Sequence, residues 1–146
     1  MGRDEGIMRI WHKDLISVLP KQQLLGQWRE CCLIAKNIAM NGTPNHLLVN
    51  KVINYPMGHL WMYGDLIRKE MESRGYKCDF ERFEQWLDKP YAMIVPDYND
   101  LFRDWHNERY LTQCYTNLQE KFDCGGIPED EMIKVGNRIS ELLLYY

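Results

Sequence analysis

PKQQLLGQWRECCLIAKNIAM, residues 20–40, carries the clearest structural pattern in the chain. Its apolar side chains recur every three or four residues, at Leu24, Trp28, Cys31/Cys32, Ala35 and Ile38. This spacing places them on one face of an α-helix. Pro20 suits the first turn of such a helix, and Gly42 suits the position just after its end. The stretch therefore predicts a long amphipathic helix.

The same periodicity continues on both sides of this stretch. It predicts further helices over residues 44–54, 58–74, 80–88 and 100–122, and a last helix that opens at Pro128. Residues 91–95, between Pro90 and Pro96, are the only strand candidate. We therefore expect an all-α fold, a single compact domain of about four to six helices. The domain spans residues 1–146, with residues 1–7 as an N-terminal extension.

Composition narrows the class of protein. With 45% hydrophobic and 27% charged residues, the chain resembles an ordinary globular domain and not a disordered one. No apolar run approaches the roughly 18–20 residues of a membrane helix, and the N-terminus lacks a secretory signal, so no membrane partner is expected. The five cysteines are odd in number and none forms a C-x-x-C pair. Reduced, buried thiols in the cytoplasm fit this pattern, and no metal site is expected.

Charge is distributed unevenly along the chain. The net charge is −3, yet residues 1–73 contain nine Lys/Arg against seven Asp/Glu, whereas residues 74–146 contain nine against fourteen. An anionic ligand should therefore meet the N-terminal half. A chance imbalance on solvated faces is the alternative.

The first predicted helix also carries a polar strip. Gln23, Gln27 and Glu30 follow i, i+4, i+7 spacing and share one face, and Arg29 lies on the adjacent strip with Gln22. Such a wall can line a polar cleft, although the same pattern also fits a solvated surface. The common nucleotide-binding and hydrolase signatures are absent from the sequence.

Two segments resemble a known family. MRIWHKDLISVLPKQQLLGQWRECC, residues 8–32, is similar to the start of pyrimidine-dimer DNA glycosylases of the phage endonuclease V type and their small bacterial relatives. These share a Met-Arg-Leu/Ile-Trp-His opening, an L-P-x-Q-Q-L-L-G-Q stretch and Arg-Glu-Cys-Cys. A second match runs over residues 46–76 and includes MGHLWMYGDLIRKEMESRGY. The resemblance implies an endonuclease V-like all-α domain whose N-terminal segment runs between helices into the site.

The resemblance also implies a chemistry. Family enzymes cleave the N-glycosidic bond at a pyrimidine dimer and then nick the strand at the abasic site, by an α-amine that forms a Schiff base and a nearby carboxylate. Carried over, the amine falls on Arg9 and the carboxylate on Glu30. We expect substrate contacts from Arg29, Gln23, Gln27, His12 and His46. The implied partner is double-stranded DNA with damaged pyrimidines, and no cofactor is implied.

Several positions depart from the family pattern. The chain begins seven residues before Met8, Arg9 is bulkier than the small residue of the phage enzymes, and Gln23 and Leu33 replace a His and an Arg. These differences keep a second hypothesis open. It describes a non-catalytic member of the family, possibly phage-encoded, that sequesters a nucleotide-like small molecule or a protein partner. The oligomeric state stays open in both hypotheses.

Overall fold

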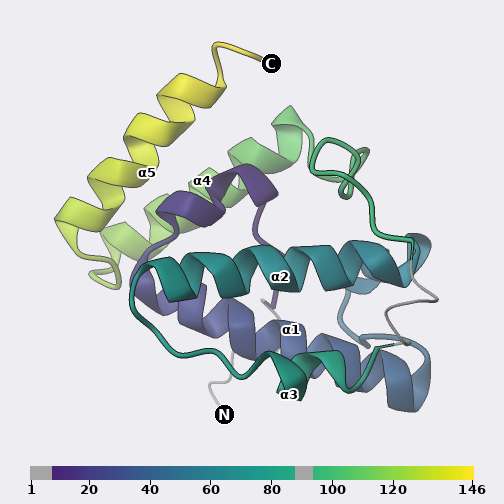
Figure 1. Cartoon of the computed structure of the whole chain (residues 1–146). Coiled ribbons are helices and arrows are strands. Elements are labelled where there is room, and N and C mark those ends of the chain that lie inside the picture. Colours follow the sequence, from purple (N-terminus) through teal and green to yellow (C-terminus); the bar gives the residue numbers. More distant parts are fainter. Residues whose placement is uncertain (1–7, 88–93) are drawn as a thin grey trace.

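The fold is all-α, as the sequence predicts (Figure 1). The computed structural model describes residues 8–87 and 94–146, and these residues contain no β-strand. The α-helices are α1 (Lys21–Asn41), α2 (Met57–Ser73), α3 (Phe80–Glu84), α4 (Glu108–Asp123) and α5 (Glu129–Leu142). The described residues also form two 3₁₀ helices, η2 (Lys13–Val18) and η3 (Asn50–Asn54). In this part of the chain no helix has both the length and the apolar character that crossing a membrane requires.

The helices form two pairs with the N-terminal segment between them. The helices α1 and α2 lie side by side, with α3 against α1, and α4 packs against α5 (Figure 1). The 3₁₀ helix η2 contacts both α2 and α5, so it joins the two pairs. The first residues described, Met8 to Trp11, therefore thread into the middle of the domain.

The helix expected over residues 44–54 is shorter in the structure. Only η3 forms there, because polar side chains hold the preceding backbone in turns. The Thr43 hydroxyl accepts a hydrogen bond from the Asn45 N–H at 3.2 Å, and Asn45 has a φ of 63°. The Asn50 side chain accepts from the His46 N–H at 3.1 Å. Such local bonds compete with a helical backbone.

The helix expected over residues 100–122 begins later, at Glu108. Residues 98–105 form turns, and Phe102 has a φ of 48° that an α-helix does not allow. Asn107 caps the true helix, since its side chain accepts from the Tyr110 N–H at 2.9 Å. Of the strand candidate, residues 91–93 lie outside the described residues, and Ile94 and Val95 are not in a strand.

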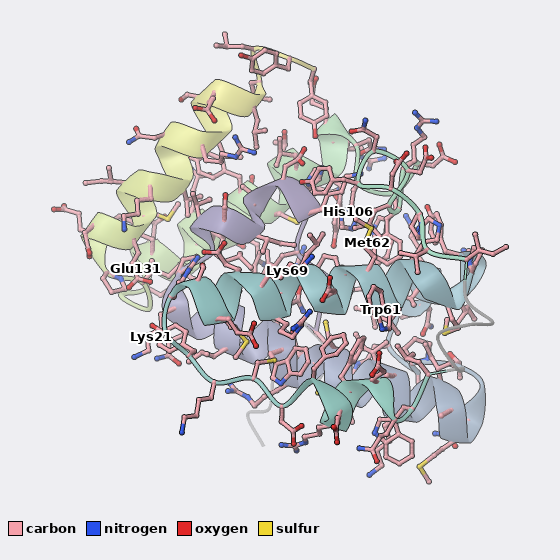
Figure 2. All side chains as sticks on the ribbon, in the orientation of Figure 1. Lys21, Trp61, Met62, Lys69, His106 and Glu131 are labelled. Atoms are coloured by element: carbon pink, nitrogen blue, oxygen red, sulfur yellow. The ribbon has the colours of Figure 1, made fainter. Side chains whose placement is uncertain are left out.

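The start of α1 is capped by a distant helix. Pro20 offers no side-chain cap, and the Lys21 N–H instead donates to the Glu131 carboxylate of α5 at 2.5 Å. Lys21 and Glu131 lie next to each other in Figure 2. A carboxylate at this end also complements the positive end of the α1 dipole. The position of α1 is therefore tied to the second helix pair.

The short helix α3 is held by close packing against α2. Phe83 of α3 is fully buried, and its ring lies 5.6 Å from the Trp28 ring of α1. Gly64 of α2 faces this ring so closely that a Cβ atom there would lie 2.4 Å from it. The glycine therefore lets α3 approach the α1–α2 pair.

Two neighbouring histidines occupy the core beside η2. The rings of His12 and His106 are 5.0 Å apart, and both residues are buried. The His12 Nδ1 accepts from the Asp14 N–H at 3.1 Å, and the His106 Nδ1 accepts from the Lys13 N–H at 2.9 Å. Burial lowers the pKa of His12 to about 4 and the pKa of His106 well below its usual value. Both rings are therefore neutral at pH 7.

We predict that Gly64→Ala lowers the free energy of unfolding by about 1–3 kcal/mol, because the added methyl group overlaps the buried Phe83 ring. Gly136→Ala on α5 is the control, since a Cβ there meets only the Tyr115 hydroxyl oxygen at 3.8 Å. It should be neutral or stabilising by up to about 1 kcal/mol. Urea unfolding of both variants measures the difference, and equal effects would contradict this packing.

We also predict an acid-sensitive core. Below pH 6.5 the unfolded chain gains protons on these histidines, while folded His12 stays neutral down to about pH 4. The free energy of unfolding is therefore highest above pH 6.5 and falls as the pH drops to 4, by up to about 1.4 kcal/mol per pH unit for each histidine. His106→Gln should reduce this slope relative to the unsubstituted protein. An unchanged slope in His106→Gln would refute the prediction.

Candidate active site

A polar cleft of about 290 Å³ opens where the N-terminal segment meets α1 and α4. Its walls are formed by Arg9, Trp11, Gln22, Gln23, Gly26, Arg29, Glu30 and Lys121. The polar strip predicted on the first helix therefore faces a concavity and not open solvent. Gly26 leaves space in the wall because it has no side chain, and a Cβ there would meet nothing closer than 3.7 Å.

The buried side chain of Gln27 organises one edge of the cleft. Its Oε1 accepts from the Trp11 N–H at 2.7 Å, and its Nε2 donates to the Arg9 carbonyl at 2.8 Å. The same Nε2 lies 3.2 Å from an Oε1 of Glu30. One amide thus binds the N-terminal segment and the acidic side chain together.

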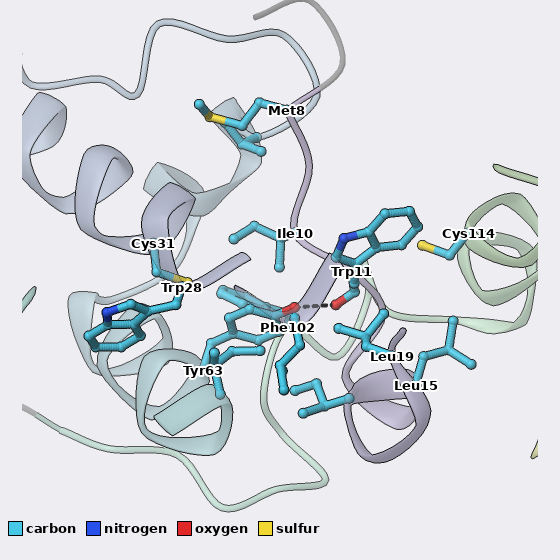
Figure 3. Packing of buried hydrophobic residues seen from close by; sticks show 14 of the residues in the cluster. Met8, Ile10, Trp11, Leu15, Leu19, Trp28, Cys31, Tyr63, Phe102 and Cys114 are labelled. Carbon is cyan, nitrogen blue, oxygen red and sulfur yellow. Dashed lines mark hydrogen bonds between the residues drawn. The ribbon is translucent and has the colours of Figure 1, made fainter. Parts of the chain in front are cut away.

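Tyr63 of α2 supports this amide from behind. Its hydroxyl lies 2.8 Å from the Gln27 Oε1 and donates to the Trp11 carbonyl at 2.6 Å. Figure 3 shows this contact, with the segment passing between α1, which carries Trp28 and Cys31, and α4, which carries Cys114. Because Gln27 and Tyr63 are both fully buried, the position of residue 9 is set by the core.

The Arg9 side chain is directed toward α4. Its guanidinium carbon lies 5.3 Å from the centre of the Trp11 ring. Burial raises the pKa of the Tyr110 hydroxyl and of the Cys114 thiol above their usual values, and the positive charge of the nearby Arg9 offsets part of each rise. The bulky side chain is therefore accommodated between the N-terminal segment and α4, while the backbone of residue 9 follows the Gln27 amide.

Cationic and amide groups surround Glu30 in the cleft. Arg29 is exposed on α1, and Lys121 approaches from the last turn of α4. The Gln23 Oε1 is buried and has no hydrogen-bond partner among the described residues. An unsatisfied buried acceptor is costly, so this atom is suited to a ligand that donates a hydrogen bond. The cleft thus combines one carboxylate, several cations and amides, which suits an anionic ligand with polar edges.

The structure places the expected site residues in four different locations. Arg9, Gln23, Arg29 and Glu30 line the cleft, and Gln27 lies behind its wall. His12 is instead buried in the histidine pair, with its Nε2 3.3 Å from the Tyr146 hydroxyl. His46 lies beyond the far end of α1 and does not line the cleft.

Sequence reasoning missed Trp11 and Lys121. Trp11 lies in the quoted N-terminal motif, so its position beside Arg9 could have indicated a role. Lys121 carries no such signal, because only the packing of α4 against the N-terminal segment brings it to the cleft.

Comparison with known proteins places this sequence in a family. Residues 8–83, more than half of the chain, match the family model of pyrimidine dimer DNA glycosylases. No curated protein and no solved structure matches the chain. The matched residues include the N-terminal segment and α1, which supply every cleft residue except Lys121, and α2, which carries Tyr63. The chain therefore belongs to the pyrimidine dimer DNA glycosylase family.

Proposed function

We propose that this protein is a DNA glycosylase with abasic-site lyase activity, acting on pyrimidine dimers or related lesions. The α-amine of a chain that begins at Arg9 is the nucleophile, and Glu30 is the catalytic carboxylate. One observation carries the proposal: the Gln27 amide binds the Arg9 carbonyl and the Glu30 carboxylate at once. A free amine on residue 9 would therefore stand beside a carboxylate at the edge of the cleft.

An α-amine suits this reaction because its usual pKa of about 7.7–8.0 leaves part of it neutral at pH 7. The neutral amine attacks C1′, the bond from C1′ to the base nitrogen breaks, and the base leaves with the bonding electrons and takes up a proton. Opening of the sugar ring then gives an iminium ion between residue 9 and C1′. Glu30 stabilises this positive charge.

Strand cleavage follows from the same iminium ion. It makes the C2′ proton acidic, and the Glu30 carboxylate accepts that proton. The electrons move to form a C2′–C3′ double bond, and the C3′–O bond breaks with the phosphate as leaving group. Hydrolysis of the imine releases the sugar fragment and restores the amine. Arg29 and Lys121 neutralise phosphate charge near the reacting sugar.

The start of the chain decides whether residue 9 has a free amine. A form that begins at Arg9 should become covalently attached to a duplex with an abasic site when borohydride is added, whereas the form that begins at Met1 should be attached far less. In the longer form the nitrogen of Arg9 belongs to a planar amide and cannot attack C1′. Denaturing electrophoresis of both forms at equal concentration and low salt measures the attachment.

The form that begins at Arg9 lacks Met8, a residue that is only 6% exposed in the structure. A difference in stability between the two forms must therefore be separated from a difference in chemistry. Thermal unfolding of both forms provides the control. Equal attachment of both forms would contradict the role of Arg9 and point to a side-chain amine. Duplex binding without attachment of either form would leave a DNA-binding protein. No duplex binding at all would favour the alternative, a family member that sequesters a nucleotide-like small molecule or a protein partner.

The proposed mechanism also depends on the carboxylate of Glu30. In the form that begins at Arg9, Glu30→Gln should reduce the rate of base release by about 10²–10³-fold, the usual loss when a group that stabilises transition-state charge is removed. Binding of the damaged duplex should persist, because a neutral amide repels phosphates no more than a carboxylate does. Single-turnover assays on a duplex with a thymine dimer measure the rate. Glu129→Gln, exposed on α5, is the matched control, and equal rates in the two variants would exclude Glu30.

A further inference from the structure

A second groove shares one lining residue, Arg29, with the cleft. It has a volume of about 240 Å³ and lies between α1 and the end of α3. Its lining is Arg29, Cys32, Leu33, Lys36, Arg82, Gln85 and Trp86. Arg29 is common to the cleft and to this α1–α3 groove, so the two hollows meet at its side chain.

Two elements fix the walls of the α1–α3 groove. Arg29, Leu33 and Lys36 follow i, i+4, i+7 spacing on α1, so they share one face and span about 10 Å along the helix axis. The opposite wall depends on α3, which the buried Phe83 ring anchors against Trp28 and Gly64. The groove is therefore supported by the core.

The groove presents positive charge without an internal counter-charge. Its lining includes three cations and no carboxylate. Within residues 8–87 and 94–146, neither Arg29, Lys36 nor Arg82 takes part in an ion pair. Burial raises the pKa of the Cys32 thiol in this lining, and the charge of Arg82 lowers that pKa while the charge of Asp79 raises it. Three cations that meet around one hollow favour an anionic occupant.

Aromatic and apolar surface accompanies these cations. Trp86 is partly exposed in the groove, and the Lys36 ammonium lies 5.8 Å from the centre of its ring. Cations beside an aromatic ring in a groove are typical of surfaces that follow a nucleic-acid backbone. Because Arg29 lines both hollows, a polyanion that extends from the cleft can contact the cations of both, whereas a single phosphate ion cannot.

We propose that the α1–α3 groove binds the phosphodiester backbone of the DNA strand next to the nucleotide held in the cleft. Lys36 and Arg82 contact phosphates, and Trp86 contacts the sugar between them. This proposal rests on the proposed function in one respect, that the cleft receives a nucleotide of DNA. Neither Lys36 nor Arg82 lines the cleft, so both contribute to binding and not to the chemical step.

The test compares two double variants with the same change of charge. The first is Lys36→Ala with Arg82→Ala. The control is Arg109→Ala with Lys134→Ala, two exposed cations on α4 and α5 outside both hollows. Affinity for an undamaged duplex and for a duplex with an abasic site is measured across a salt series, and single-turnover cleavage is measured at saturating DNA.

Loss of two phosphate contacts should make the slope of log affinity against log salt concentration shallower by about 2. Both duplexes should lose affinity by the same factor, since phosphate contacts do not read sequence or damage. The control should keep the original slope, and saturated cleavage should be unchanged in both variants.

Equal slopes in the two double variants would overturn the groove proposal, while borohydride attachment of the unsubstituted protein would still support the proposed function. A shallower slope without any attachment would support the groove and overturn the lyase mechanism. If the unsubstituted protein binds neither duplex at low salt, the groove proposal falls as well.

Discussion

The hydrogen bonds of one buried amide hold this site together. Gln27 uses both functional atoms of its side chain: Oε1 accepts from the Trp11 N–H and lies beside the Tyr63 hydroxyl, while Nε2 donates to the Arg9 carbonyl and to Glu30. A buried amide is stable only when its donors and acceptors are satisfied, and a network of this kind fixes geometry more strictly than apolar packing does. The N-terminal segment, α1 and α2 therefore have one mutual arrangement, and the cleft follows from it.

Much of the fold could be predicted because apolar periodicity is local. The bounds of α1 and α2 follow from residues within each helix. The start of α4 could not be predicted, because distant partners fix the preceding turns: the Lys13 ammonium donates to the carbonyls of Tyr98 and Leu101, and His59 Nδ1 accepts from the Phe102 N–H. These contacts satisfy backbone groups that a helix would otherwise pair, and no local pattern indicates them.

The same difference between local patterns and contacts from distant residues applies to the site. Helical spacing predicted that Gln23 and Glu30 share a face, and the family resemblance gave that face a role. The burial of His12 could not be read from its neighbours, because its ring is enclosed by His106 from far along the chain. Lys121 reaches the cleft only through the packing of α4. The α1–α3 groove likewise depends on α3, whose position is set by the contact of Phe83 with Gly64.

In the proposed mechanism the amine of residue 9, and no side-chain amine, forms the bond to C1′. The cleft offers a direct competitor, because Lys121 lines it too. Peptide mapping by mass spectrometry of the borohydride-reduced adduct decides between them. We predict that the sugar mass lies on the N-terminal nitrogen of the peptide that begins at Arg9. Finding that mass on the peptide that contains Lys121 would contradict it.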